Sequence, residues 1–170
     1  TIFFDPRTVE LGENLTASQV VKQQILDAIA SAEEKSGQPA RTLEVPVSFG
    51  DADALDLDGI AEFAGISAEK AIAIFLESEY RVFMLGFLPG FAYMGTVDPR
   101  IAMPRRSTPR LAVPDGSVAI AGEQTGIYPT ESPGGWNIIG RTEVPLITGD
   151  QNSPCFFRAG DRVRFVDAAV

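Results

Sequence analysis

The chain has 170 residues, of which 45% are hydrophobic and 22% charged, as expected for one globular domain or for one domain plus a fragment. Its net charge of −9 argues against nucleic-acid binding, because neutralising phosphates requires clustered cations. No apolar run approaches the roughly 18 residues of a membrane-spanning helix, so we expect no membrane partner and, given the net charge, no nucleic-acid partner. The lone Cys155 cannot form an internal disulfide, which favours the reducing cytoplasm.

The first 40 residues predict a strand followed by a helix. Ile2–Phe4 are consecutive apolar residues and predict a short strand. Thr16, with Gln19 three positions later, has the pattern of a capping box, and apolar residues then recur every four positions. We therefore expect a helix from about residue 17 to residue 35, ending before a linker at Gly37–Pro39.

The next 40 residues predict a strand and two short helices. Apolar and polar residues alternate over Leu43–Val47, as in a half-buried strand. Asp56 is placed to cap a helix that ends at Gly65, and Ser67 is placed to cap a second helix. The two helices together predict a helical hairpin.

The segment from Gly86 to Gly140 has a different composition, with nine of the 16 glycines and seven of the 12 prolines. Long helices are excluded there, because glycine and proline break them. Short apolar stretches within this segment and on both sides of it are separated by turn residues, and they favour a small closed β-barrel. These stretches are Tyr80–Leu85, Val118–Ala121, Trp136–Ile139 and Val163–Val166.

The absence of histidine excludes whole classes of mechanism. No Ser-His-Asp or Cys-His arrangement and no histidine-based metal site can form within this chain, so we expect no metal. There is no phosphate-binding loop, and no lysine follows Lys70. A reaction here needs carboxylates, tyrosines, arginines, backbone dipoles or groups contributed by another chain.

The densest group of candidate residues lies in Gly122–Trp136. Glycines allow successive backbone N–H groups to converge on an anion, and Gln124, Tyr128 and Ser132 add polar side chains beside the apolar Trp136. The alternative is a pair of tight barrel turns around a buried tryptophan.

A second group is the arginine-rich stretch Asp98–Arg110, which carries four arginines. Its prolines keep it extended, and the guanidinium groups suit recognition of a carboxylate, a phosphate or an acidic partner. The alternative is ion pairing with this protein's own acidic half, since residues 1–80 carry 15 acids and five cations, whereas residues 81–170 carry eight acids and nine arginines.

A third group is the Pro-Gly turn within Gly86–Gly95, which carries Phe87, Phe91 and Tyr93. If this segment is exposed, it is a docking loop whose aromatic rings anchor a partner. If it is buried, it is a corner of the barrel. We favour exposure, because strands rarely continue through Pro-Gly.

Several of these segments, in the same order, resemble one family: the B-type subunits of bacterial 5-oxoprolinase, also called KipI-like or allophanate hydrolase subunit 1. The resemblance is good from about Arg41 to Val166. The segments that carry it are Tyr80–Gly95, Pro104–Arg110, Gly116–Ala121, Gln124–Trp136, Ile139–Thr142 and Gly160–Phe165.

The resemblance implies a mainly β fold with accessory helices. It implies a cyclophilin-like β-barrel over residues 41–170, preceded in residues 1–40 by part of an α+β, ferredoxin-like N-terminal domain. At Phe75 the family pattern is expected to show histidine, and we interpret the phenylalanine as core filling.

The resemblance also implies a subunit of an ATP-dependent complex that opens the lactam 5-oxoproline to glutamate, with ATP bound on this chain or on another subunit. Its partners would be a homologous C-type subunit, with which it forms a composite site, and a further catalytic subunit. The alternative function is that of a KipI-like inhibitor, which binds a sensor histidine kinase directly.

The site residues expected on this view fall into three sets. The catalytic candidates are Gln124 and Tyr128. The candidates for binding the substrate or an anion are Arg105, Arg106, Arg110, Ser132, Gly134, Gly135 and Trp136. The candidates for binding a partner are Phe87, Phe91 and Tyr93.

Overall fold

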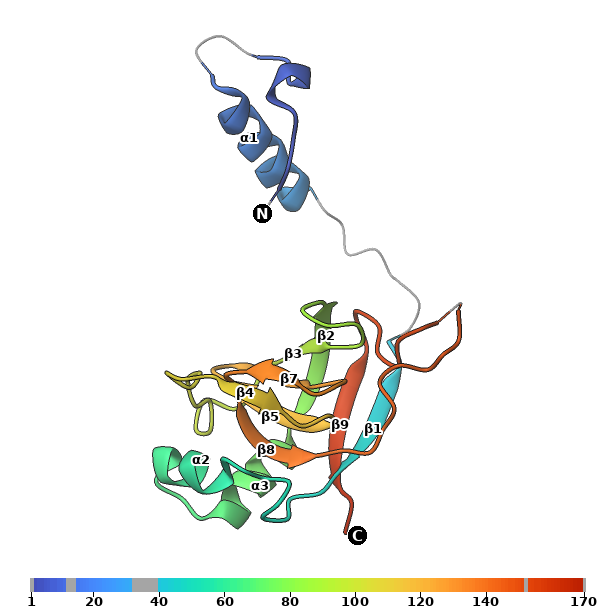
Figure 1. The fold of residues 1–170 in the computed structure, drawn as a ribbon. Helices are drawn as coiled ribbons and strands as arrows, with labels where there is room; N and C mark the ends of the chain where they lie inside the picture. Colours follow the sequence, from blue (N-terminus) through green and yellow to red (C-terminus); the bar gives the residue numbers. More distant parts are fainter. Residues whose placement is uncertain (1, 12–14, 32–39, 152, 170) are drawn as a thin grey trace. The chain divides into compact units, whose positions relative to one another are not determined.

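The computed structural model describes residues 2–11, 15–31, 40–151 and 153–169, and the chain divides into two compact units, Thr1–Pro39 and Ala40–Val170 (Figure 1). The first unit contains the 3₁₀ turn η1 (Pro6–Thr8) and the helix α1 (Ala17–Ala30). Whether this unit is part of an α+β domain stays a prediction.

The helix predicted in the first unit is confirmed, but the strand is not. Thr16 and Gln19 form the expected capping box, and α1 then continues to Ala30. The remainder of the predicted helix and the Gly37–Pro39 linker lie outside the described residues. Ile2–Phe4 have no strand structure, because a strand needs a neighbouring strand to bond to, and the described part of this unit offers none.

The second unit is built on a seven-stranded sheet in the order β1-β9-β2-β3-β6-β5-β8, with a separate pair formed by β4 and β7. The strands β1 and β9 run parallel, whereas the other pairs are antiparallel. The bounds are β1 Thr42–Val47, β2 Glu79–Leu85, β3 Ala92–Gly95, β4 Arg110–Val113, β5 Ser117–Ala121, β6 Gln124–Ile127, β7 Ser132–Gly134, β8 Asn137–Arg141 and β9 Arg162–Asp167.

The two end strands of the sheet meet and nearly close it into a barrel. Directly after β1, the Ser48 N–H donates to the Arg141 carbonyl at 2.7 Å, and the Arg141 N–H donates back to the Ser48 carbonyl at 2.9 Å. A methyl group at Gly140 would lie 2.6 Å from Val47 Cγ1, so glycine lets the strands approach this closely. The predicted mainly β barrel is confirmed.

The helices α2 (Leu57–Ala64) and α3 (Ala68–Glu77) form the predicted hairpin beside the barrel, where α2 contacts β8 and α3 contacts β9 (Figure 1). Ser67 caps α3 as expected, because its hydroxyl accepts from the Lys70 N–H. Gly65 ends α2 in the left-handed conformation. Asp56 stands at the start of α2 but makes no capping hydrogen bond, because its carboxylate is engaged by other groups. Within the described residues, no helix combines the length and the hydropathy of a membrane-spanning segment.

The core consists of a large cluster, to which the strands of the seven-stranded sheet and the helices α2 and α3 all contribute, and a smaller separate cluster. Phe75 lies in the large cluster, buried and stacked on Phe165 with ring centroids 4.8 Å apart, which agrees with core filling at this position. The smaller cluster contains Phe91, Val113, Ala119, Tyr128, Trp136 and Ile138. Strand β4 contributes Val113 to this cluster, and its pairing with β7 places Arg110 opposite Gly134. This pairing therefore joins the arginine-rich stretch to the glycine-rich loop.

The barrel closure predicts opposite effects for two Gly→Ala substitutions. Gly140→Ala should destabilise the barrel by about 1–3 kcal/mol, because its methyl group would collide with β1. Gly59→Ala should instead stabilise by about 0.5–1 kcal/mol, because it lies in α2 and a methyl group there meets no atom within 4 Å. Urea unfolding followed by fluorescence of the single, buried Trp136 measures both. Equal stability of the two variants would contradict the closure.

Candidate functional site

A pocket of about 340 Å³ opens over the smaller core cluster, and we call it the aromatic pocket. It is lined by Phe87, Phe91, Tyr93, Arg105, Pro109, Ala121, Gln124, Tyr128, Pro133, Gly134, Gly135 and Trp136. All three groups of candidate residues found in the sequence contribute to this one pocket.

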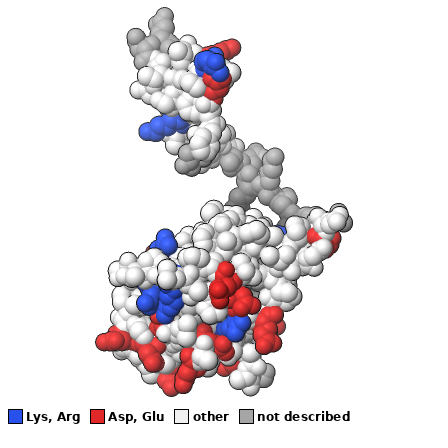
Figure 2. Space-filling view, viewed as in Figure 1, with Lys and Arg blue, Asp and Glu red and all other residues white. Residues whose placement is uncertain are grey.

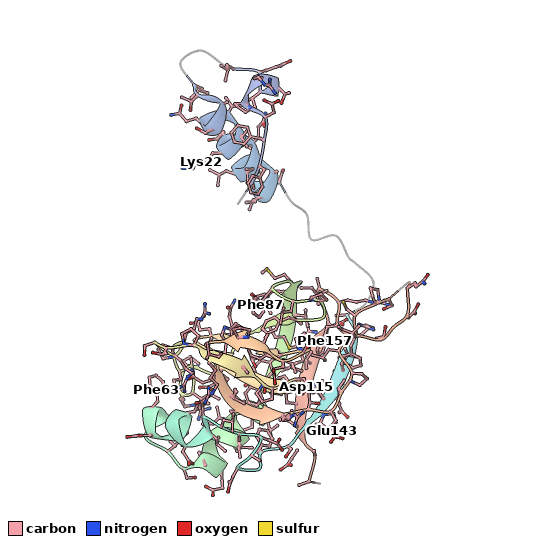
Figure 3. The ribbon with its side chains drawn as sticks, viewed as in Figure 1. Lys22, Phe63, Phe87, Asp115, Glu143 and Phe157 are labelled. Atoms are coloured by element: carbon pink, nitrogen blue, oxygen red, sulfur yellow. The ribbon has the colours of Figure 1, made fainter. Side chains whose placement is uncertain are left out.

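The floor of the aromatic pocket is a set of rings packed edge to face around Phe91. The centroid of Phe91 lies 4.9 Å from Tyr93 and 5.5 Å from both Tyr128 and Trp136. Such contacts fix the orientation of each ring and stabilise it beyond simple burial. Phe87, labelled in Figure 3, also lines the pocket, and 60% of its surface is exposed.

Tyr128 carries the one hydroxyl of the floor that is almost wholly enclosed. Its side chain packs directly on Gly134, where a methyl group would lie 2.3 Å from the Tyr128 Oη. Burial raises the pKa of Tyr128, although a hydrogen bond from the Trp136 backbone and the nearby Arg105 charge oppose that effect. The phenol is therefore neutral at pH 7, where it can donate a hydrogen bond but cannot act as a base.

Arg105 is the cation of the pocket. A methyl group at Gly135 would lie 3.8 Å from the Arg105 Nη2, which places the guanidinium over the glycine-rich loop. Among the described residues no carboxylate forms an ion pair with it, in contrast to its neighbours Arg106 and Arg110. Its hydrogen-bond donors are thus available to an anion.

Asp56 holds the other two arginines of this stretch. Its Oδ1 accepts from Arg106 Nη1 at 2.7 Å and from Arg110 Nη2 at 2.9 Å, and its Oδ2 accepts from Arg110 Nη1 at 2.7 Å. Oδ2 also accepts from the Ile138 N–H of β8 at 2.7 Å. Burial would raise the pKa of Asp56, but the bonds from Arg110 and Ile138 outweigh it and lower that pKa.

Two further hydrogen bonds hold the backbone on each side of Arg105. The Asn137 side-chain amide donates to the Pro104 carbonyl at 2.8 Å. The Arg106 N–H donates to the Gly135 carbonyl at 2.9 Å. Together with Asp56, these contacts fix the segment that carries Arg105 against the edge of the pocket.

The structure separates the predicted site residues into those that line the pocket and those that do not. Gln124, Tyr128, Arg105, Gly134, Gly135 and Trp136 line it, so residues far apart in sequence are brought together. Arg106 and Arg110 instead pair with Asp56, which corresponds to the alternative of ion pairing with the acidic half. Ser132 is buried in β7 outside the pocket lining, and its hydroxyl has no hydrogen-bond partner among the described residues.

The aromatic segment Gly86–Gly95, which connects β2 to β3 and includes β3, combines both of its predicted alternatives. Phe87 is exposed, as expected for a docking loop, whereas Phe91 is only 1% exposed and belongs to the core. Tyr93 is half-buried in the pocket wall. Burial therefore makes Phe91 unsuitable as a partner anchor, and partner binding through Phe87 and Tyr93 stays a prediction.

Sequence reasoning missed the role of Asp56. The local sequence indicates only a helix-capping role for Asp56, because no nearby residue indicates any other use. Its partners lie 50, 54 and 82 positions away in the chain. The one available signal was the excess of acids in the first half over the arginines of the second, which predicted such pairing in general but not this residue.

The chemistry of the aromatic pocket is incomplete for catalysis. Its lining residues include no carboxylate, imidazole, amine or thiol, so none of them is a base at neutral pH. No group of three or more metal-ligating side chains occurs in the described part of the chain either. The pocket can bind an anionic, partly apolar molecule and donate hydrogen bonds to it.

The sequence of the chain matches a family model and proteins of known name. A family model described as carboxyltransferase domain, subdomain C and D, matches residues 1–157. The chain is 41% identical to the B subunit of 5-oxoprolinase from Bacillus subtilis, over 98% of this chain and 70% of that protein. It is 44% identical to the corresponding B subunit from Escherichia coli O157:H7, over 75% of this chain but only 58% of that protein.

A solved structure agrees with these sequence matches. The crystal structure of a conserved uncharacterized protein from Pyrococcus horikoshii is similar with a TM-score of 0.71 and 38% identity. The similarity covers 96% of this chain and 72% of that one.

Asp56→Asn should destabilise the barrel by about 1–3 kcal/mol at pH 7, because it weakens charge-assisted bonds to two arginines. Because the pKa of Asp56 is lowered in the folded state, its charge stabilises the fold fully at pH values above the ordinary aspartate pKa of about 3.9. This contribution is lost as the pH falls toward the lowered value in the folded state. Urea unfolding followed by Trp136 fluorescence should therefore show a smaller difference in the free energy of unfolding between the variant and the parent protein at pH 3 than at pH 7.

The matched control is Asp115→Asn, which removes an ion pair to Arg141 in which the Asp115 side chain is 67% exposed. Exposed pairs contribute less than about 1 kcal/mol, so this variant should change little. If both variants lose the same free energy of unfolding, the contacts of Asp56 with Arg106, Arg110 and Ile138 do not stabilise the barrel more than an exposed ion pair does.

Proposed function

The chain belongs to the carboxyltransferase-domain family and, within it, to the B subunits of 5-oxoprolinase, and from this membership we propose that it is the B-type subunit of an ATP-dependent 5-oxoprolinase. The observation that carries the proposal is the aromatic pocket, which offers an anion-binding arginine and hydrogen-bond donors but no base. Such a pocket suits a subunit that contributes half of a composite site.

The groups in the pocket match the chemistry of 5-oxoproline, a small cyclic amide that bears a carboxylate. The free guanidinium of Arg105 is suited to pair with that carboxylate. The rings of Tyr93 and Trp136 offer apolar surface to the methylene groups of the lactam ring. The volume of about 340 Å³ lies at the small end of the 300–1000 Å³ typical of ligand pockets.

The catalytic contribution of this chain would be to polarise the amide. The neutral Tyr128 hydroxyl is a suitable donor to the lactam oxygen, where negative charge develops during attack on the carbonyl carbon. Gln124, exposed at the mouth of the pocket, adds a second donor that can adapt to a bound ligand. Both donors act on charge that develops in the transition state, so they would raise the rate of ring opening.

The groups missing from this chain must come from its partners. We assign the base that activates the attacking water, and the binding of ATP, to the homologous C-type subunit and to a further catalytic subunit. The aromatic pocket supports this division, because it has no lysine to pair with a triphosphate and no carboxylate to hold magnesium.

The isolated chain should therefore hydrolyse no ATP in response to 5-oxoproline, whereas the complex reconstituted with its C-type and catalytic subunits should. Phosphate release, with and without 5-oxoproline, measures both. Turnover by the rigorously purified single chain would contradict the composite site. An assembled complex without activity, together with direct binding and inhibition of a sensor histidine kinase, would favour the inhibitor function instead.

Two substitutions in the reconstituted complex should separate binding from catalysis. Arg105→Gln should raise the KM for 5-oxoproline about 10–100-fold, because a charged hydrogen bond to the carboxylate is lost. Tyr128→Phe should lower kcat about 100-fold with little change in KM, because it removes a donor to the developing oxyanion. Steady-state phosphate release measures both constants.

The matched control is Arg100→Gln, whose guanidinium pairs with Asp98 in an exposed position and does not line the aromatic pocket. It should retain normal constants. If the complex assembles and both pocket variants keep full activity, the site assignment is wrong even though the chain remains a subunit of the enzyme.

A further inference from the structure

A second and larger hollow lies beside the barrel closure, and we call it the closure groove. It has a volume of about 1360 Å³, against about 340 Å³ for the aromatic pocket. The ends of β1 and β9, the turn between β4 and β5, and the segment that follows β8 form its walls. The two hollows share one lining residue, Tyr128.

The surface of the closure groove is largely apolar. Phe49, Pro129, Val144 and Pro145 contribute to it, and these four side chains are partly or fully exposed. Proline and phenylalanine rings present flat, rigid surfaces that lose little conformational entropy when a ligand covers them. An apolar groove of this kind is a typical binding surface on a folded domain.

The rim of the groove is acidic. Asp53, Asp115, Glu143 and Asp167 line it, and the cation among the lining residues is Arg141. Figure 2 shows acidic side chains gathered on this face around a basic one, and Figure 3 labels Asp115 and Glu143 there. Arg141 is already engaged, because its Nη2 lies 3.0 Å from the Asp115 Oδ1.

The remaining three carboxylates have no ion-pair partner among the described residues. Asp53 accepts a hydrogen bond from the Ser48 hydroxyl at 2.7 Å, and Asp167 accepts one from the Ala169 N–H at 2.9 Å. Neither donor carries a charge, and no described side chain is bonded to the Glu143 carboxylate. The lining thus carries four acids and one cation, a net charge of −3.

The size and charge of the groove together favour one class of occupant. We propose that the closure groove binds an extended segment of a partner protein that carries lysine or arginine side chains. Its volume exceeds the 300–1000 Å³ usual for compact small ligands, which favours a stretch of polypeptide. The unpaired carboxylates select a cationic segment and repel phosphate-bearing ligands such as nucleic acid.

This surface differs from the aromatic pocket in what it would bind. The pocket offers an unpaired guanidinium to an anion, whereas the groove offers unpaired carboxylates to cations. The proposal therefore does not depend on the 5-oxoprolinase function, and its test does not use enzyme activity.

The test uses the full chain and a fluorescein-labelled peptide of alternating lysine and proline, with an alternating glutamate and proline peptide as the charge control. Fluorescence polarisation at low salt should show binding of the lysine peptide alone. Glu143→Gln combined with Asp167→Asn should weaken that binding about tenfold, because two carboxylates of the rim are neutralised. The matched double variant, Glu62→Gln with Glu131→Gln, makes the same charge change on exposed residues outside the groove and should weaken binding less than about twofold.

A map of the bound peptide provides a second measurement. Amide chemical shifts of the ¹⁵N-labelled chain should change at Phe49, Asp53, Val144 and Ala168 when the lysine peptide is added. Equal weakening by the two double variants, or shift changes elsewhere on the barrel, would show non-specific attraction to an acidic protein and overturn the proposal. Equal binding of the glutamate peptide would overturn it as well.

Discussion

The carboxylate of Asp56 is the contact on which the geometry of the candidate site depends. It accepts hydrogen bonds from Arg106, from Arg110 and from the Ile138 backbone, and so joins the start of α2, the arginine-rich stretch and β8. A buried carboxylate needs such partners, and the arginines equally need it. With its two neighbours bound in this way, Arg105 is left as the arginine that faces the aromatic pocket.

The aromatic pocket is preorganised by packing as well as by charge. Phe91 holds Tyr93, Tyr128 and Trp136 in edge-to-face contact, and Gly134 leaves room for the Tyr128 ring. A ligand would then meet a Tyr128 hydroxyl whose position is already fixed, which lowers the entropic cost of binding. The lining also includes no base, and this is why we interpret the chain as one contributor to a composite reaction centre.

The uneven distribution of charge along the chain corresponds to ion pairs in the folded structure. Acids of the first half pair with arginines of the second, as Asp56 does with Arg110 and Glu79 with Arg162 and Arg164. These pairs link segments that are distant in sequence. The acids left unpaired beside the barrel closure, among them Glu143, give that face its negative charge.

Local sequence signals predicted most of the helices and strands and limited the chemistry that this chain can perform. The capping box at Thr16, the capping residue Ser67, the alternating strands and the glycine- and proline-rich half predicted α1, the helical hairpin and a barrel, because these signals act over a few residues. The absence of histidine excluded whole mechanisms without any structure. The predicted strand at Ile2–Phe4 was wrong, since a strand also requires a neighbour that local sequence does not specify.

Which candidate residues share a pocket depends on the folded chain. It placed Arg105 beside Tyr128 and Gln124, turned Arg106 and Arg110 toward Asp56, and buried Phe91 while exposing Phe87. These outcomes depend on pairings between strands and on contacts across 50 or more positions. Contacts at such separations follow from the closure of the barrel, which no short stretch of sequence encodes.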